Sequence, residues 1–145
     1  MCSYDKDIES AKEFQSEVND RGNVIDKMLK RILVENLKVK LVNRGTGHKI
    51  DMFKKHKKSL INKYSGDFDE LVKKLYTFND IWIITKHGMI AAGLGKVVFD
   101  KDDDVPPRPP YIFDEERIAD IFKEYKEIRD GLHEIAYNLE HNRSL

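Results

Sequence analysis

The sequence has little cysteine and proline, and it lacks any long apolar run. Cys2 is the only cysteine in 145 residues, which excludes an internal disulfide and a cysteine-rich zinc site. No apolar run exceeds four residues, as in 81–84, whereas a membrane-spanning helix needs roughly twenty. The N-terminus also has no apolar signal core. These absences predict a cytoplasmic protein that neither crosses a membrane nor is secreted, and we expect no cofactor and no metal.

An excess of one charge sign is lacking too, because 26 basic side chains balance 26 acidic ones. The balance hides a segregation along the chain. Residues 27–63 carry twelve basic and two acidic side chains, whereas 1–26 carry three and seven and 100–120 carry three and eight. Zero net charge argues against strong nonspecific DNA binding, but the basic segment predicts a local electrostatic docking site. The length and the 40% of hydrophobic residues fit one globular domain over 1–145.

Apolar residues recur at helical spacing along most of the chain. The stripes cover 25–37, 50–64, 68–87 and 118–139. We therefore predict an all-α, up-and-down bundle of four or five helices. The first helix extends upstream of residue 25, and Gly22 either interrupts it or merely bends it.

Residues 89–112 break this pattern, because glycines, an acidic run and a proline-rich block cannot be helical throughout. The apolar triplets 97–99 and 111–113 either pair as a small hairpin or tether a long irregular loop. A connection of this length is unusual in a compact domain. Asp114 and the two glutamates after it then place acidic residues at the positive end of the last helix.

The densest charge feature is the predicted basic helix that follows Gly47. A lysine stripe of this kind neutralises RNA phosphates without reading sequence, or docks on an acidic protein surface. A solvated helix face is the plainer alternative. The RNA- or partner-binding candidates are Lys49, Lys54, Lys55, Lys57, Lys58 and Lys63.

Two Arg–His pairs also have a spacing that places both side chains on one side of a helix. Arg129 and His133 are one turn apart on the last helix, and Arg44 and His48 have the same spacing across a glycine-rich turn. Such a pair could bind a phosphate and move a proton, although ordinary surface residues are the plainer interpretation.

Two segments carry a family resemblance. Residues 19–26 read NDRGNVID, and residues 75–90 read LYTFNDIWIITKHGMI. Together they resemble the HEPN superfamily of small helical-bundle proteins, and the first segment is similar to its mannitol-repressor-like members. The resemblance implies a homodimer. In active members, which are metal-independent ribonucleases, an Arg four to six residues before a His binds the scissile phosphate, and the His moves a proton.

The family motif is incomplete in this chain. His87 matches the catalytic His, but Trp82 stands where the Arg is expected. The resemblance therefore implies a non-catalytic, dimeric binding or regulatory module in a toxin–antitoxin, phage-defence or transcription-regulation setting, which engages RNA or an acidic protein. The motif or interface residues are Asn79, Asp80, Trp82 and Lys86, and Trp82 is expected to pack against the core or a dimer partner.

Two alternatives stay open beside this interpretation. One is a ribonuclease that uses His87 with a cation foreign to the family, such as Lys86 or Arg129. The other is a helical scaffold or interaction protein with no nucleic-acid role.

Overall fold

The predicted all-α bundle is confirmed by the computed structural model, which describes residues 3–87, 89–91, 97–100 and 111–145, and side chains for 8–86 and 112–145. The helical elements appear in chain order as α1 (Ser3–Lys30), its π-helical continuation η1 (Arg31–Asn36), α2 (Thr46–Lys55), the short α3 (Lys57–Leu60), the 3-10 turn η2 (Ile61–Lys63), α4 (Phe68–His87) and α5 (Glu115–Glu140). Within these residues, no helix combines the length and apolar composition of a membrane crossing.

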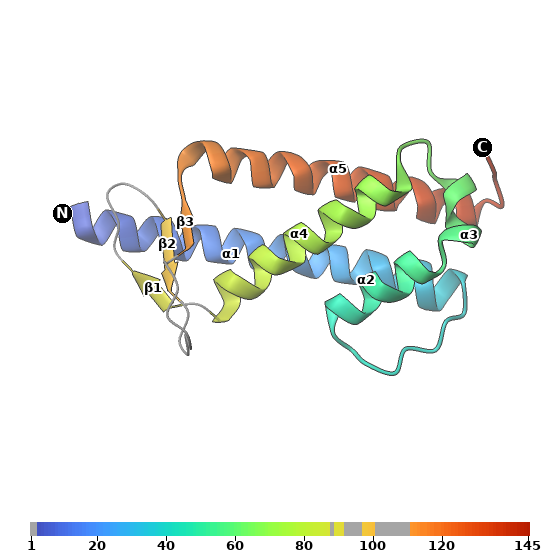
Figure 1. The fold of residues 1–145 in the computed structure, drawn as a ribbon, viewed down its shortest axis with the longest axis horizontal. Helices are drawn as coiled ribbons and strands as arrows, with labels where there is room; N and C mark the ends of the chain where they lie inside the picture. The colour runs from blue at the N-terminus through green and yellow to red at the C-terminus, as the bar shows by residue number, and fades with distance from the viewer. Residues whose placement is uncertain (1–2, 88, 92–96, 101–110) are drawn as a thin grey trace.

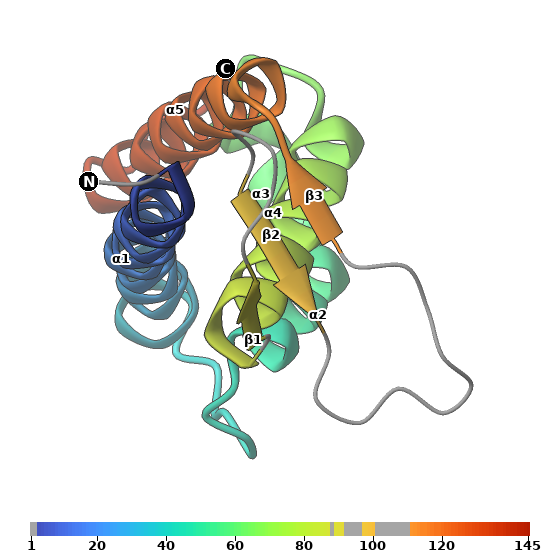
Figure 2. The ribbon, with the colours of Figure 1, turned by 90° about the vertical axis from the view of Figure 1, so that its left-hand side faces the viewer.

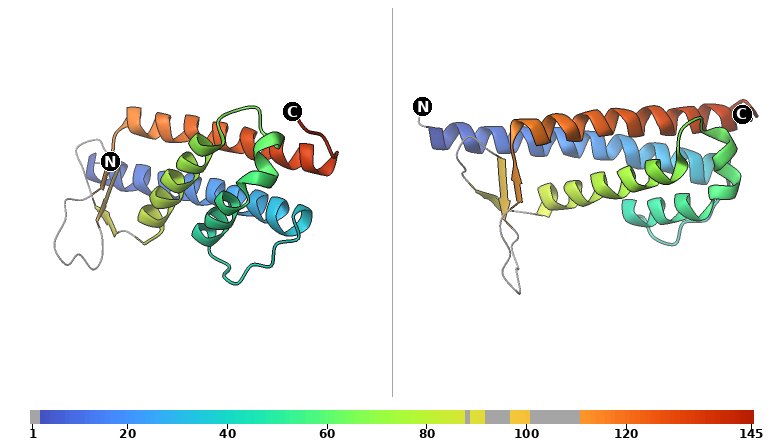
Figure 3. Two further views of the ribbon diagram at one scale, coloured as in Figure 1. Left: turned by 45° about the vertical axis from the view of Figure 1, so that its right-hand side comes forward. Right: turned by 45° about the horizontal axis from the view of Figure 1, so that its top comes forward.

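The helices form two layers around one core. The long helices α1 and α5 lie side by side in one layer, and α2 and α4 cover them in the other (Figure 1 and Figure 3). By the colour sequence of Figure 1, α1, α2 and α5 run in the same direction and α4 runs opposite to them. Phe53 of α2 stacks on Phe68 of α4 within one layer, with ring centroids 5.0 Å apart. Phe78 of α4 and Tyr125 of α5 join the two layers, with ring centroids 5.7 Å apart.

A small antiparallel sheet lies at one end of the bundle, beside the N-terminal half of α1 (Figure 2). It contains β1 (Met89–Ala91), β2 (Val97–Asp100) and β3 (Tyr111–Phe113) in that order. Of the two alternatives left open for the apolar triplets, the structure shows the hairpin, with Val98 opposite Ile112. The strand β1 was not predicted, and residues 101–110 lie outside the described ones.

Side-chain caps begin the two helices that follow turns. Asp67 accepts a hydrogen bond from the backbone N–H of Glu70 (3.1 Å), and Asp114 accepts one from that of Arg117 (2.8 Å). Each carboxylate satisfies an amide that the helix leaves without a partner and complements the positive end of the helix. Acidic residues at these starts are therefore part of the fold.

The predicted continuous basic helix is wrong, because the chain leaves helical geometry at His56 (φ −93°, ψ 24°). Its backbone N–H still bonds to the carbonyl of Met52, and α3 begins at the next residue. The lysines are thus divided between two short helices and a 3-10 turn. The break lets Phe53 and Leu60 both point into the core, where each is fully buried.

Gly22 does not interrupt the first helix, which continues through it for the whole of α1. A Cβ atom at this position would lie 2.3 Å from Cδ2 of Trp82, so α4 packs its indole directly on the α1 backbone. A helix-interior glycine costs about 1 kcal/mol relative to alanine. Here the glycine makes room for the largest side chain of α4.

Candidate functional site

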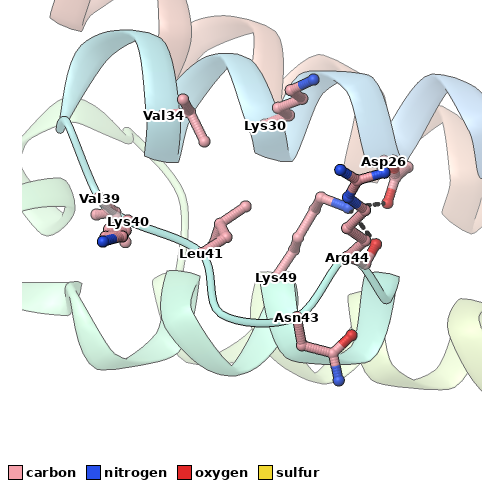
Figure 4. Close-up of a pocket in the computed structure, with 9 residues that line it drawn as sticks. All are labelled: Asp26, Lys30, Val34, Val39, Lys40, Leu41, Asn43, Arg44 and Lys49. Atoms are coloured by element: carbon pink, nitrogen blue, oxygen red, sulfur yellow. Dashed lines mark hydrogen bonds and ion pairs between the residues drawn. The ribbon is translucent and has the colours of Figure 1, made fainter.

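The candidate site is a hollow of about 660 Å³ between the end of the first helix and the segment 37–45 that leads into α2 (Figure 4). The first helix supplies the upper wall and the segment supplies the lower one. The lining residues are Asp26, Lys30, Val34, Val39, Lys40, Leu41, Asn43, Arg44 and Lys49. Four of these nine side chains are basic and one is acidic.

A buried ion pair holds the inner wall of the hollow together. Lys49, whose residue is only 4% exposed, donates from Nζ to Oδ1 of Asp26 (2.9 Å) and to the carbonyl of Arg44 (2.6 Å). Thr46 donates its hydroxyl to the same Asp26 oxygen (2.7 Å). A buried ammonium needs a paired charge and hydrogen-bond acceptors, and this arrangement provides both.

A backbone hydrogen bond lies at one end of the 37–45 segment, and a bond from a backbone N–H to a side chain lies at the other. The N–H of Val39 donates to the carbonyl of Leu33 (2.8 Å), and Lys38 turns the chain with a left-handed φ of 58°. At the other end, the N–H of Gly45 donates to Oδ1 of Asn43 (2.7 Å), and α2 begins at the next residue. The lower wall is therefore held in place by contacts of the chain itself.

The charges around the hollow do not cancel. Lys49 already compensates Asp26, whereas Lys30, Lys40 and Arg44 make no ion pair with any residue that the structure describes. These three side chains are exposed at the rim. Val34, Val39 and Leu41 give the same hollow an aliphatic wall. The arrangement suits an anion that carries an apolar group.

The structure divides the six predicted lysines into two sets. The prediction that Lys49 binds RNA or a partner is wrong, because its ammonium is buried in the pair with Asp26 and cannot reach a partner from the surface. Lys57 is paired with Asp69 (3.0 Å). Lys63 donates to the backbone carbonyl of Arg143 and to the hydroxyl of Ser144 (3.0 Å) in the C-terminal tail. The exposed lysines that have no ion-pair partner among the described residues are Lys54, Lys55 and Lys58.

The one acidic residue of α2 is hydrogen-bonded to a side chain of α4. Asp51 accepts a hydrogen bond from the hydroxyl of Tyr76. Burial, together with this bond and the nearby carboxylate charge, raises the pKa of Tyr76 to about 12, so the phenol keeps its proton at neutral pH. Asp51 is thus tied to the neighbouring helix and makes no ion pair with a lysine of α2.

The segment that resembles the HEPN motif uses its residues inside one chain. Trp82 is 9% exposed, lies on Gly22, and donates from Nε1 to Oδ1 of Asn19 (3.2 Å). The ammonium of Lys86 is exposed and lies 5.8 Å from the centroid of the Trp82 ring. Trp82 was expected to pack either against the core or against a dimer partner, and the structure places it in the core. His87 is the last residue of α4, and its side chain lies outside the described ones.

The other two motif residues lie on different sides of α4. Asn79 is half-buried and packs beside Gly47 at the start of α2. Its Nδ2 lies 3.6 Å from the point where a Cβ atom on Gly47 would lie. Asp80 is exposed and lines a hollow of about 300 Å³ whose apolar members include Ile81, Ile84 and Ile112. These residues therefore do not gather with the lysines of α2 and α3 into one site.

Arg129, the arginine considered as a substitute for the Arg of the HEPN-like motif, is engaged elsewhere. The guanidinium of Arg129 pairs with Asp130 (3.3 Å) and lies 5.9 Å from the ring centroid of Tyr125. The Tyr125 ring packs on Phe78, nine residues or about 13 Å of helix before His87. Arg129 thus does not lie at the end of α4 where His87 is found.

Of the residues that line the hollow, sequence reasoning named only Lys49 as a binding candidate. Lys30 and Lys40 had no motif to mark them, Asp26 was quoted only as the end of the 19–26 segment, and Arg44 was noted only for its spacing to His48. That pair does not form a site in the hollow, because His48 is not among the lining residues, although its Nε2 atom is buried without a hydrogen-bond partner in the described chain. One signal could have indicated that Lys49 is buried: it lies with Ile50 and Phe53 on the buried face of α2.

The chain matches no known family model, no curated protein and no solved structure in the comparisons. Across the described side chains, no three His, Cys, Asp or Glu residues gather closely enough to hold a metal ion.

Proposed function

We propose that this chain is a non-catalytic RNA-binding module whose exposed lysines on α2 and α3 neutralise backbone phosphates. The observation that carries the proposal is the set Lys54, Lys55 and Lys58, three exposed cations without an acidic partner among the described residues. Phosphate neutralisation by such cations releases counterions from the nucleic acid and gives affinity that does not depend on sequence.

The basic hollow extends this surface. The exposed Arg44, just before α2, borders the hollow, and Lys54 and Lys55 are on the last turn of that helix. Ten helical residues span about 15 Å, which exceeds the screening length of about 8 Å at physiological ionic strength. Cations at both ends of α2 can therefore act on different phosphates of one strand.

The geometry around Trp82 supports the non-catalytic part of the proposal. The indole occupies the position of the expected motif Arg and is committed to Gly22 and Asn19, so it offers no positive charge for a scissile phosphate. A phosphate clamp is usually the largest contribution to phosphate-ester transition-state stabilisation, and a histidine alone does not replace it. The proposal thus treats the chain as a degenerate HEPN-like module with a regulatory role.

A homodimer is part of the proposal, and the surface best suited to it lies near the end of α4. Ile83 is 49% exposed and Ile112, on β3, is 53% exposed. A second chain that covers these two side chains would remove their apolar area from water. Sedimentation velocity of the wild type and of Ile83→Lys tests this part separately, because a dimer that uses the surface dissociates in the variant.

Fluorescence anisotropy of a labelled single-stranded RNA at a series of salt concentrations tests the proposal. We expect binding that weakens steeply and linearly on a log–log plot of affinity against salt concentration. Labelled polyglutamate of similar length serves as the alternative partner. Tighter binding of polyglutamate than of RNA, or RNA binding that does not respond to salt, contradicts the proposal.

A further inference from the structure

We propose that the hollow between the first helix and the 37–45 segment is a binding site for a phosphomonoester. The dianionic phosphate binds at Arg44, while Lys30 adds positive charge from the helix above and Lys40 adds it from the other end of the hollow (Figure 4). The organic group attached to the phosphate lies on Val34, Val39 and Leu41. The inference deepens the proposed function, on which it rests, because a terminal phosphate of a bound RNA is one source of this group. A free small phosphomonoester is the other source.

The first argument is charge. Asp26 is the only acidic residue that lines the hollow, and Lys49 compensates it at 2.9 Å. Asp26 also accepts the hydroxyl of Thr46, so the carboxylate is already well supplied with donors. The rim cations consequently have no acidic partner within the described chain. A phosphomonoester brings between one and a half and two negative charges at neutral pH, more than the single charge of a backbone phosphodiester.

The second argument is hydrogen-bond geometry. The Arg44 guanidinium is a planar fork that matches two phosphate oxygens at once, whereas each lysine adds a single mobile point charge. Arg44 stands directly before Gly45, the N-cap of α2, which makes no side-chain capping bond. The positive end of a ten-residue helix therefore begins beside the proposed phosphate position.

The third argument is that the hollow is preformed. Lys49 binds the carbonyl of Arg44 at 2.6 Å, and the N–H of Val39 binds the carbonyl of Leu33 at 2.8 Å. Lys49 is thus a positioning residue, which fixes the backbone that presents Arg44 and contributes its own charge to Asp26. Binding does not have to order this wall first, which lowers its entropic cost.

The fourth argument is size and polarity. A volume of about 660 Å³ is within the range of small-molecule sites and far exceeds that of a phosphate ion. Three aliphatic side chains line it together with the cations, as Figure 4 shows for the side chain of Val34, which extends from the first helix toward the segment below. Covering that wall requires an organic group. We therefore expect a phosphomonoester to bind more tightly than inorganic phosphate.

The test compares one short RNA in three forms, with a 5′-phosphate, a 3′-phosphate or only hydroxyl ends. Anisotropy is measured for the wild type, for Arg44→Gln/Lys40→Gln, and for the matched control Lys54→Gln/Lys55→Gln. The first pair removes two hollow cations and the second removes two helix cations, so both pairs change the net charge equally. Phenyl phosphate and inorganic phosphate are titrated by calorimetry against the same proteins.

We expect the wild type to bind one phosphorylated form about tenfold more tightly than the hydroxyl form, as one or two charge-assisted hydrogen bonds provide. Arg44→Gln/Lys40→Gln should abolish this preference and leave binding of the hydroxyl form within about threefold. The control pair should weaken all three forms and keep the preference. Lys30→Gln, on the opposite wall, is the second variant if the double variant fails to fold.

The outcomes separate the inference from the proposed function. Phenyl phosphate binding that Arg44→Gln/Lys40→Gln removes, without any preference for RNA ends, supports the site and assigns it to a small molecule, even where RNA does not bind at all. RNA binding with no preference for a phosphorylated end, together with no heat from phenyl phosphate, overturns the inference and leaves the proposed function standing. Equal affinities for phenyl phosphate and inorganic phosphate also overturn it.

Discussion

The indole of Trp82 lies so close to Gly22 that a Cβ atom there would be 2.3 Å from Cδ2, 2.5 Å from Cε2 and 2.6 Å from Cε3. This contact joins α4 to the middle of α1 and commits the residue at the motif Arg position to the core. The hydrogen bond from Nε1 to Asn19 fixes the ring in this orientation. The same contact thus explains why α1 is uninterrupted and why Trp82 lies in the core.

Gly22→Ala should destabilise the protein although alanine is the better helix former. The alanine gains about 1 kcal/mol of helix propensity, but it forces apart two backbones held by a rigid ring. Overpacking of a core costs about 1–3 kcal/mol and more when the neighbour cannot move, so we expect a net loss of about 2 kcal/mol. Urea unfolding followed by circular dichroism measures it.

Gly47→Ala is the matched control, because its Cβ would meet only Nδ2 of Asn79 at 3.6 Å, an ordinary contact. That variant should be neutral or slightly stabilising. In a Trp82→Ala background, Gly22→Ala should lose most of its effect. An equal loss of stability in both backgrounds would mean that the ring is not the cause.

The pair of Asp26 and Lys49 predicts an asymmetric response to mutation. Asp26→Ala leaves the buried ammonium of Lys49 without its carboxylate, a situation that costs about 3–5 kcal/mol. Lys49→Met leaves Asp26, whose side chain is 28% exposed and can be hydrated, so we expect a smaller loss. Urea unfolding of both variants shows which one loses more stability. A larger loss for Lys49→Met would contradict the conclusion that Lys49 is the more deeply buried partner.

A bidentate pair between η1 and α5 predicts an acid-sensitive contribution to stability. Arg31 donates from Nε to Glu140 (2.6 Å) and also from its second nitrogen. The bonds to Arg31, and a weaker one to Asn36, lower the pKa of Glu140 to about 2. Because the folded pKa lies below the unfolded one, the contribution is complete above about pH 4.5 and is lost as the pH falls toward 2.

Glu140→Gln should therefore be less stable than the wild type at pH 7, and the difference should shrink steadily between pH 5 and pH 2. Thermal unfolding at a series of pH values measures this. Glu9→Gln, on exposed α1 surface without a partner among the described residues, should show no such convergence. A Glu140→Gln difference that stays constant over this range would refute the linkage.

His87→Ala should change neither RNA binding nor the integrity of added RNA. The expected result follows from Trp82 at the Arg position and from Arg129, which is held by Asp130. Incubation of purified protein with total RNA, resolved on a denaturing gel, measures it, and His133→Ala on exposed α5 is the control. Cleavage by the wild type that disappears only in His87→Ala would establish the ribonuclease alternative instead.

Helix positions and the edge hairpin could be predicted from the sequence because their signals are local. The stripe of α5 and its acidic start at Asp114 follow from spacing and residue type. The role of Gly22 could not be predicted, because the residue that it accommodates comes sixty positions later in the chain. Local helix propensity alone does not distinguish a glycine that breaks the helix from a glycine that lets another helix approach closely.

The candidate site was only partly predictable for a similar reason. Counting lysines identified the basic segment, and three of the six are indeed exposed without partners among the described residues. The count could not show that Lys49 turns inward to Asp26, since this pairing depends on how α1 and α2 pack. The hollow also required the path of the 37–45 segment, which the left-handed Lys38 and the backbone bond of Val39 determine.

The salt dependence of RNA binding by two matched variants tests the central claim most directly. Lys54→Gln/Lys55→Gln/Lys58→Gln removes the three exposed lysines of α2 and α3. Lys12→Gln/Lys73→Gln/Lys126→Gln removes three exposed lysines from α1, α4 and α5 and changes the net charge equally. We predict that the first variant lowers the log–log slope of affinity against salt by about two, whereas the second leaves it nearly unchanged. Equal slopes for the two variants would contradict the account.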